Sequence, residues 1–554
     1  MSDHPAFFGS DEEPSGIPAD LLPYLEAADE PSEADRQAEQ ARQEAEEAAD
    51  RADRERTEAL RALVENSLLL GPDPSILAEI ESDEDEDGTP SDEEDHERML
   101  DDAQQAAQER AEVARIYESI VARAPEHKVQ PSLERVRSVM DILGDPHTSY
   151  PSVHITGTNG KTTTARMMDA LLGALGLRTG RFTSPHLLDV RERICLDGEP
   201  ISHRAFIDAY HDVQPYIDMV DHSSIEQGGP TLSFFEVFTV MALAAFADYP
   251  VDAAVVEVGM GGTWDSTNVV DGQVGVIMPI DVDHQKWLGN TVTDIAHEKA
   301  GIIKPGQIAV VAHQRDEVLE ILRERADQVG ARLLVEGTDF EVVARERAVG
   351  GQLMSLRTPH AMYTDIFLPL HGEHQAHNAA AALTGVEAFI GERALDAQVV
   401  EQAFGAVTSP GRLQVVRRSP MIIVDGAHNP AGARTVRAAI DDLGLAHVVG
   451  VFAAMSDKDV DTMLGEVEPV MDELIVTQMD SVRAMELDDV QAIAEDVFDD
   501  TRVSRIPDIA EAIAEAATRV ETRAKPGENV AVIVFGSIVL AGQATQIISQ
   551  ANGR

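Results

Sequence analysis

The sequence of 554 residues contains one cysteine, Cys195, and no long apolar stretch. A single thiol cannot form an internal disulfide, which excludes a fold held together by a disulfide framework. No apolar run approaches the ~20 residues of a membrane-spanning helix. The N-terminal MSDHPAFFGSDEEP also lacks the basic and then apolar pattern of a signal peptide. We therefore expect a soluble protein of the reducing cytoplasm, with no membrane partner.

Positive charge is scarce as well, because the formal net charge is −55. Residues 1–120 carry 37 acidic side chains against nine arginines and no lysine. Nucleic-acid binding needs clustered Lys and Arg side chains on the phosphates, so we expect no nucleic-acid partner. An anionic nucleotide would have to bind through a local binding site rather than through the overall electrostatic field of the protein.

Lysine is rare even among the basic residues, with seven lysines against 37 arginines. Arginine supplies the positive charge at most basic positions, so each remaining lysine is a candidate for a role that arginine cannot fill. The seven are Lys128, Lys161, Lys286, Lys299, Lys304, Lys458 and Lys525.

An acidic extension of about 127 residues opens the chain. Residues 33–70 are rich in Ala, Glu and Arg, which are strong helix formers, and this composition predicts a helix. Residues 81–97, ESDEDEDGTPSDEEDHE, form a like-charge block that we expect to be disordered. The extension is either a solvated tail or an interaction arm, and nothing in its sequence selects a partner.

From Lys128 on, short apolar runs alternate with helical patterns, which is typical of parallel α/β structure. A helix is expected over 162–175 and a β-rich stretch over 332–370, and the length suggests more than one domain. The predicted strands are 151–156, 252–258, 272–280, 308–312, 421–425, 447–453, 473–479 and 529–535.

The motif GTNGKTT follows one predicted strand and opens a helix, which is the context of a phosphate-binding loop. Gly157 and Gly160 would allow close backbone approach, and Lys161 could reach the β- and γ-phosphates. Only Thr158 and Asn159 separate the two glycines, so this is a shortened form of the usual loop. The alternative is a glycine-containing turn that binds nothing.

A second motif, VVEVGMGGTWDSTNVV, places Glu257 at the carboxyl end of a buried strand. Ligands collect at this edge of a parallel sheet. Carboxylate oxygens suit Mg²⁺, which usually retains some of its waters. Taken alone, a glutamate in this position could equally be a cap or an ion-pair partner.

A third motif, PIDVDHQKWLGNTVTDIAHEKAGIIKPG, contains His284 and Lys299. Chemistry that needs a neutral primary amine requires lysine rather than arginine. One such reaction is carbamylation, in which CO₂ adds to the amine and creates a carboxylate that can bind a metal. A structural role is the alternative for the histidine.

An ordered series of motifs from about residue 130 to residue 545 resembles the bacterial folylpolyglutamate synthase/dihydrofolate synthase family, within the Mur ligases. The motifs are QPSLERVRSVMDILG, HITGTNGKTTT, RFTSPHLLDVRERI, SFFEVFTVMAL, EVGMGGTWDSTN, DVDHQKWLGNTVTDIAHEKAGIIK, HQAHNAAAAL, SPGRLQ, DGAHNPAG, DKD and VFGSIVLAG.

The resemblance implies an ADP-forming amide ligase. A substrate carboxylate takes the γ-phosphoryl group of ATP to become an acyl phosphate, and the α-amino group of L-glutamate then attacks it. The acceptors would be dihydropteroate and/or the γ-carboxylate of tetrahydrofolate (poly)glutamates. The implied architecture is the extension 1–127, an ATP-binding domain 128–408 with a mostly parallel sheet, and a smaller Rossmann-like α/β domain 409–554. We expect a monomer.

Matching motif positions imply roles for individual residues. Lys161, Glu257, His284, Lys299 and His428 would be catalytic. ATP would contact Gly157, Thr158, Asn159, Gly160, Lys161, Thr162, Thr163, Asn378, Arg412 and Asp425. One Mg²⁺ site would use Thr162 or Thr163, Ser184 and Glu257, and a second would use His284, carbamylated Lys299 and Glu257. The incoming glutamate would meet His428 and Ser537. The pterin would contact Ser132, Leu133, Ser233, Phe234, Phe235, Glu236, Trp264, Asp265 and Ser266.

Three features depart from the family pattern. The chain has Thr263, Trp264 and Ser266 where GGRLDATN is common, Thr162 where many members carry glycine, and the acidic extension.

Two other functions compete with the folate ligase. A cell-wall Mur ligase would need a UDP-binding α/β domain, which residues 1–127 cannot supply. A non-catalytic scaffold disagrees with the intact set of lysine, glutamate and histidine residues in the three motifs.

The phosphate-loop assignment predicts the effect of Lys161→Ala. Removing the ammonium should abolish ATP-dependent ligation, because phosphoryl transfer depends on neutralising phosphate charge. The measurement is incorporation of labelled L-glutamate, and near-normal turnover by the variant would contradict the assignment.

Overall fold

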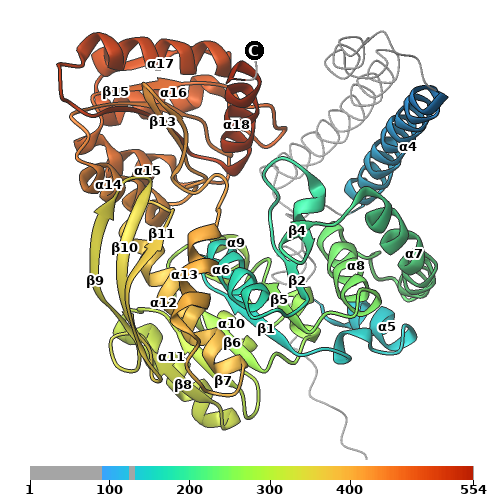
Figure 1. The fold of residues 1–554 in the computed structure, drawn as a ribbon. Helices are drawn as coiled ribbons and strands as arrows, with labels where there is room; N and C mark the ends of the chain where they lie inside the picture. The colour runs from blue at the N-terminus through green and yellow to red at the C-terminus, as the bar shows by residue number, and fades with distance from the viewer. Residues whose placement is uncertain (1–89, 124–131, 553–554) are drawn as a thin grey trace, which may run out of the picture. The chain divides into compact units, whose positions relative to one another are not determined.

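The computed structural model describes residues 90–123 and 132–552 (Figure 1). The chain divides between Ala111 and Glu112 into two compact units, so the helix α4 (Pro90–Val121) belongs to both. All of the strands that the structure describes lie in the second unit. Within the described ranges, no helix is long and apolar enough to cross a bilayer.

The start of α4 corrects one expectation about the extension. Residues 90–97, the end of the acidic block that was expected to be disordered, are helical. Proline is well tolerated at the first helical position, and acidic residues are favoured in the first turn because they interact with the helix dipole. The helix predicted over 33–70 and the rest of the block lie outside the described residues.

An eight-stranded sheet forms the centre of the second unit, in the order β4-β3-β2-β5-β1-β6-β7-β8. The pairs from β2 to β8 are parallel, and the β2–β3 and β3–β4 pairs are antiparallel. The strands are β1 (Ser152–Thr156), β2 (Thr179–Phe182), β3 (Ile194–Leu196), β4 (Glu199–Pro200), β5 (Ala253–Glu257), β6 (Val274–Ile277), β7 (Ile308–Val311) and β8 (Arg332–Val335).

Apolar side chains alternate between the two faces of this sheet, so each face has its own core. Val255 packs with α6, α12 and α13, whereas its neighbour Val256 packs with α5, α7 and α8. Next to β6 and β7, the core contains side chains of α10 and α11. These helices are α5 (Glu134–Ile142), α6 (Lys161–Ala174), α7 (His203–Glu226), α8 (Phe234–Asp248), α10 (Val292–Lys299), α11 (Asp316–Val329), α12 (Glu373–Phe389) and α13 (Ala397–Ala406).

The β-rich stretch predicted over 332–370 contains β8 and an antiparallel three-stranded sheet. This sheet has the order β11-β10-β9, and its apolar side chains join the core formed by α6 and α12. Its strands are β9 (Glu341–Ala348), β10 (Gly351–Arg357) and β11 (Met362–Leu368).

A six-stranded sheet organises the C-terminal part, which we define as β12 to α18 and which is orange to red in Figure 1. The central part is defined as β1 to α13. The strand order is β12-β13-β17-β14-β15-β16, and the β12–β13 pair is antiparallel whereas the others are parallel. The strands are β12 (Gln414–Arg418), β13 (Met421–Val424), β14 (His447–Phe452), β15 (Glu473–Val476), β16 (Val503–Arg505) and β17 (Val530–Phe535).

Helices cover both faces of the six-stranded sheet. One face packs against α14, α15 and α16, and the other packs against α17 and α18. Their bounds are α14 (Pro430–Leu443), α15 (Val460–Val467), α16 (Leu487–Phe498), α17 (Ile509–Arg523) and α18 (Ile538–Asn552). The predicted fold class, a large and mostly parallel α/β core with a smaller α/β part, is confirmed.

Short helices fill several connections between these elements. They are α9 (Gln285–Leu288), η1 (Pro146–Thr148), η2 (Val190–Arg193), η3 (Ser266–Val269), η4 (Ala300–Ile302), η5 (Glu468–Val470) and η6 (Asp500–Arg502).

Candidate active site

A cavity of ≈ 330 Å³ is lined by loops from both large sheets. Segments after β1, β2, β5 and β6 meet segments after β13, β14 and β17, so the carboxyl ends of parallel strands supply much of the wall. Open α/β sheets bind ligands at this edge. The predicted site residues on the wall are Ser132, Gly157, Thr158, Asn159, Gly160, Lys161, Thr162, Thr163, Ser184, Ser233, Phe235, Glu236, Glu257, Trp264, Asp265, Ser266, His284, Lys299, Asn378, Arg412, Asp425, His428 and Ser537.

The loop between β1 and α6 needs both of its glycines. Gly157 has φ 145°, and a Cβ there would lie 2.6 Å from Cβ of Met278. Gly160 has φ 88°, and a Cβ there would lie 2.7 Å from Oδ1 of Asn378. Any other residue would be strained by its backbone conformation and would collide with the neighbouring element. The glycines thus keep the loop backbone close to these neighbours.

Lys161, the first residue of α6, folds back over this loop. Its Nζ donates hydrogen bonds to the carbonyl oxygens of Gly157, at 3.0 Å, and Thr158, at 3.2 Å. Burial lowers the pKa of Lys161, while Glu257 and Asp283 oppose that shift. The ammonium is thus partly shielded from water, so an anionic ligand would interact with it more strongly than in bulk solvent.

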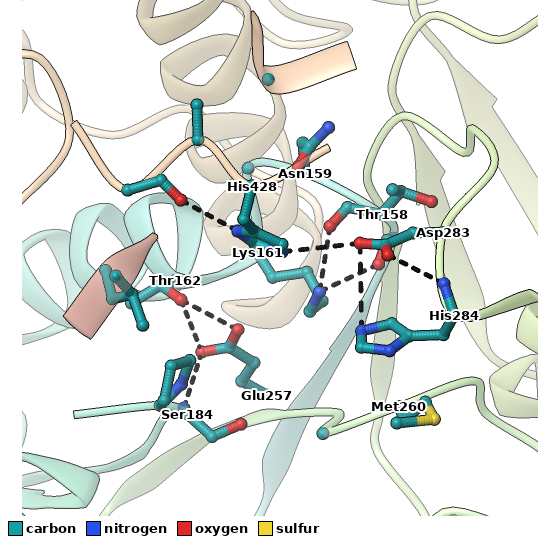
Figure 2. A pocket seen from close by; sticks show the side chains of 18 of the residues that line it. Thr158, Asn159, Lys161, Thr162, Ser184, Glu257, Met260, Asp283, His284 and His428 are labelled. Atoms are coloured by element: carbon teal, nitrogen blue, oxygen red, sulfur yellow. Dashed lines mark hydrogen bonds and ion pairs between the residues drawn. The ribbon is translucent and has the colours of Figure 1, made fainter. Parts of the chain in front are cut away.

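Glu257 ends β5 and is almost completely buried. The hydroxyl of Thr162 lies 2.9 and 3.0 Å from the two carboxylate oxygens and donates to them, and the backbone N–H of Ser184 donates at 3.2 Å. Figure 2 shows these groups converging on the carboxylate. Burial raises the pKa of Glu257, and Lys161 and these donors counteract the increase.

The two threonines of the loop differ in their partners. Thr163 shares a hydrogen bond of 2.8 Å with the hydroxyl of Ser409, whereas Thr162 faces Glu257. Among the residues that the structure describes, no group of three or more His, Cys, Asp or Glu side chains is arranged to hold a metal ion. A Mg²⁺ ion at Glu257 would therefore also need hydroxyl, water and phosphate oxygens, which is common for Mg²⁺ bound with a nucleotide.

Lys299 and His284 line the same cavity from α10 and from the loop before α9. Lys299 is 4% exposed, and its Nζ donates a 2.8 Å hydrogen bond to the carbonyl oxygen of Gly157. Burial, together with nearby Lys161, lowers the pKa of Lys299 to about 7. Burial also lowers the pKa of His284 to about 4. A neutral amine is therefore accessible at Lys299, and the imidazole of His284 is neutral at pH 7.

The C-terminal part contributes a buried carboxylate. Asp425 follows β13, and burial raises its pKa. The carboxylate accepts the backbone N–H groups of Leu413, at 2.8 Å, and Ala427, at 2.7 Å. These bonds hold together the two loops that present Arg412 and His428 to the cavity.

The predicted pterin residues do not all reach the cavity. Leu133 borders a different hollow, although its neighbour Ser132 lines the cavity. Phe234 is 6% exposed and packs in the core of the sheet face covered by α5, α7 and α8, with the guanidinium of Arg193 4.8 Å from its ring centre. Phe235, the next residue along the chain, lines the cavity. Of these two adjacent phenylalanines, Phe234 therefore packs in the core and Phe235 lines the cavity.

Thr263, one departure from the family pattern, also does not line the cavity. Its hydroxyl donates to the backbone carbonyl of Glu298 at 3.0 Å, and it borders the second hollow. The adjacent Trp264 does line the cavity, and its backbone N–H donates to the Glu298 carboxylate at 3.2 Å. Of these two departures, Thr263 therefore lies beside the site, whereas Trp264 lies at the cavity wall.

Asp283 and Lys458 line the cavity but have no role in the sequence-based assignment. Asp283 lies directly before His284, and Lys458 belongs to the DKD motif after β14. The scarcity of lysine already marked Lys458 for attention, so composition carried a usable signal for it. Asp283 had no comparable signal, because aspartate is abundant in this chain.

Comparison with known proteins places this geometry in a family. Residues 222–386 match the Mur ligase middle domain, and residues 411–538 match the Mur ligase glutamate ligase domain. The chain is 44% identical over 448 residues to the dihydrofolate synthase/folylpolyglutamate synthase of Mycobacterium tuberculosis, and the match covers 77% of this chain and 92% of that protein. The chain belongs to the dihydrofolate synthase/folylpolyglutamate synthase family.

Solved structures of family members have the same fold. The M. tuberculosis folylpolyglutamate synthase complexed with ADP and AMPPCP superimposes with a TM-score of 0.75 at 44% identity, covering 79% of this chain and 99% of that chain. The Escherichia coli FolC in complex with DHPP and ADP gives a TM-score of 0.68 at 26% identity, covering 79% and 98%. The family's ATP-dependent ligase architecture therefore extends over most of the described residues.

The hydrogen bond from Thr162 to Glu257 predicts the effect of Thr162→Val. Valine keeps the shape of the side chain but leaves the buried carboxylate without one donor, so the pKa of Glu257 should rise further. We expect the rate of ADP formation with saturating substrates to fall roughly tenfold.

A matched control is Thr384→Val in α12. Thr384 is buried and donates its hydroxyl to the carbonyl of Ala380 at 2.8 Å, but it does not line the cavity. This variant should form ADP at close to the normal rate. Equal effects of the two substitutions would show that the loss at Thr162 reflects general packing rather than Glu257.

Proposed function

We propose that this family member is an ATP-dependent amide ligase that adds L-glutamate to dihydropteroate and to the γ-carboxylate of tetrahydrofolate (poly)glutamates. The observation that carries the proposal is one cavity in which the phosphate loop and Glu257 of the central part face Asp425 and His428 of the C-terminal part, with Arg412 just before β12. Phosphoryl transfer and amide formation could take place there without release of an intermediate into water.

The reaction that fits this cavity has two steps. The acceptor carboxylate attacks the γ-phosphorus of ATP, the bond to the β-phosphate oxygen breaks, and ADP and an acyl phosphate result. The neutral α-amino group of glutamate then attacks the acyl carbon, an amide bond forms, and phosphate leaves with the electron pair of the broken C–O bond. One proton is released from the amine.

The residues of the phosphate loop would hold the transferred group during the first step. The Lys161 ammonium and the loop N–H groups would stabilise the phosphates electrostatically, and shielding from water strengthens that interaction. Asn378, Arg412 and Asp425 would contact the nucleotide. Contact between the central and C-terminal parts would exclude water from the acyl phosphate.

The incoming amino acid would bind on the side of the C-terminal part. His428 and Ser537 both line the cavity there. An imidazole N–H can donate a hydrogen bond to a substrate carboxylate, and a hydroxyl can serve as donor or acceptor. The pterin would lie toward Phe235 and Trp264, whose rings suit a flat heterocycle.

Two Mg²⁺ sites are part of the proposal, and the residues present fit them. Glu257, Ser184 and Thr163 would hold the first ion. The hydroxyl of Thr162 already contacts Glu257 and is a further candidate ligand, whereas that of Thr163 is paired with Ser409. Carbamylated Lys299 and neutral His284 would serve the second ion. When bound, Mg²⁺ neutralises phosphate charge and polarises the phosphoryl group.

The domain boundaries 128–408 and 409–554, the monomeric state and the cytoplasmic location also belong to the proposal. The two large sheets support a boundary near residue 409, because β12 opens the second of them shortly afterwards.

The decisive assay is ATP- and Mg²⁺-dependent ligation of labelled L-glutamate with dihydropteroate and with tetrahydrofolate as separate acceptors. Product with both acceptors is the expected result. Product with tetrahydrofolate alone would leave a dedicated polyglutamate synthase, and product with dihydropteroate alone a dihydrofolate synthase. No product with either acceptor would overturn the proposal.

The carbamylation proposal predicts that Lys299→Arg is severely impaired even though the positive charge is kept. Arginine provides no neutral amine to react with CO₂. We expect a loss of roughly 10²-fold in ligation rate, the size found when the surroundings of a metal site are damaged. The control is Lys525→Arg, because the Lys525 side chain is 76% exposed and should tolerate the same change.

A second measurement separates carbamylation from a simple packing effect. Enzyme depleted of CO₂ should regain activity on addition of bicarbonate, and the gain should be greater above pH 7 than below it, because the pKa of Lys299 is about 7 and only the neutral amine reacts. The labelled carbamate should be visible by NMR with ¹³C-bicarbonate. Full activity of Lys299→Arg would remove the role in metal binding.

A further inference from the structure

Asp283 lies in the loop between β6 and α9, one residue before His284. Its side chain is 9% exposed, and it lines the cavity. A buried carboxylate is costly unless charged or hydrogen-bonding partners surround it. The partners of Asp283 therefore indicate what the residue does.

Three of those partners come from the C-terminal part, whereas Asp283 belongs to the central part. Lys458 Nζ donates to Oδ1 at 3.0 Å, and Asn429 Nδ2 donates to Oδ2 at 2.9 Å. Nε2 of His428 lies 3.5 Å from Oδ2, and Nε2 of His284 lies 3.9 Å from it. In Figure 2, dashed lines connect Asp283 with the side chains of both histidines.

The ring of His428 lies between its own loop and Asp283. Its Nδ1 lies 2.9 Å from the carbonyl oxygen of Gly426, and its Nε2 lies 3.5 Å from Oδ2 of Asp283. Asp283 therefore faces three side chains of the C-terminal part, those of His428, Asn429 and Lys458.

Electrostatics agrees with this arrangement. The Lys458 ammonium lies 3.0 Å from the Asp283 carboxylate, and a neighbouring opposite charge offsets part of the cost of burying that carboxylate. The Lys458 side chain is also 9% exposed, so water screens this pair only weakly.

Another ion pair between the two parts is much more open. Arg434 of α14 pairs with Asp281, and its side chain is 45% exposed. Exposed pairs of this kind contribute little to stability. A third ion pair, between Arg345 of β9 and Asp442 of α14, is less open, with side chains 17% and 23% exposed. The contact at Asp283 is more deeply buried than either pair, and it lies at the cavity wall, so it is the candidate for fixing cavity residues of the C-terminal part.

We propose that Asp283 is a positioning residue that holds the C-terminal part on the central part and fixes His428 and Lys458 at the cavity wall. The carboxylate acts through these two side chains and Asn429, and it touches no reacting atom. The proposal uses the proposed function only for the identity of the reaction. Held in this way, the Lys458 ammonium and the His428 ring face the space where the carboxylates of an amino acid would bind.

The test is a distance measurement on the Asp283→Asn variant. Spin or fluorescent labels would be placed at Glu320→Cys in α11 and Glu521→Cys in α17, both exposed positions, because the native Cys195 is buried. With ADP bound, the unsubstituted enzyme should give mainly one short distance. We call the short-distance population closed and the long-distance population open. The variant should shift toward longer distances, and its ratio of closed to open population should fall roughly tenfold or more.

The matched control is Arg434→Gln, which removes the exposed ion pair and should leave the distances unchanged. An unchanged distance distribution in Asp283→Asn would overturn the proposal. So would an equal shift in both variants, because the buried carboxylate would then have no special role.

A double-mutant cycle protects the test against a variant that simply folds poorly. Lys458→Gln should shift the distances in the same direction as Asp283→Asn, and the double variant should be no more open than the more affected single variant. Additive effects on the closed-to-open ratio would contradict a direct pairing. Thermal unfolding of all variants would show whether the fold is kept.

Kinetics supplies a further readout that a purely structural role would not produce. Asp283→Asn should raise the KM for glutamate and lower kcat, while the affinity for ADP changes less than about threefold. If the KM for glutamate, kcat and the affinity for ADP were all impaired by the same factor, Asp283 would not be a positioning residue. Because the distances are measured with ADP alone, they remain informative even if neither folate acceptor gives product, so the two proposals can fail separately.

Discussion

The structure depends on balancing charges that are at least partly shielded from water within one cavity. Lys161, Glu257, Lys299 and Asp283 all line it, and isolated ions in such a place would be costly. Each of them has partners: loop carbonyls for the lysines, a hydroxyl and an N–H for Glu257, and two donors and a histidine ring of the C-terminal part for Asp283. Binding of a charged nucleotide can exploit groups that are already held in place.

The position of the cavity follows from the direction of the strands. In both large sheets the chain leaves parallel strands toward the same edge, and the polar loops after those strands meet there. Gly157 and Gly160 let the first of these loops lie against its neighbours, while the alternating apolar side chains of the strands fill the cores on either side. A rigid scaffold thus carries loops whose polar groups are available for chemistry.

Much of the fold was predictable because its signals are local. The strand before the Gly157–Gly160 loop, the helix after it and four strands of the second sheet, β13, β14, β15 and β17, follow from short runs of apolar residues with turn residues between them. The edge strands β12 and β16 were not predicted. The prediction for the end of the acidic block was wrong for a local reason too, since Pro90 and the acidic residues after it favour a helix start. Phe234 and Phe235 show the limit of prediction from sequence, because the two identical residues do not indicate which ring packs in the core and which lines the cavity.

The sequence alone determined the class of fold, the glycine-containing loop before α6 and the family, because these depend on residue types at fixed spacings along the chain. Only the tertiary structure decided which side chains meet. Asp283 and Lys458 are 175 residues apart, and Thr162 rather than Thr163 faces Glu257. Such pairings depend on how two sheets pack and on which way each side chain points, and no local pattern encodes either of these.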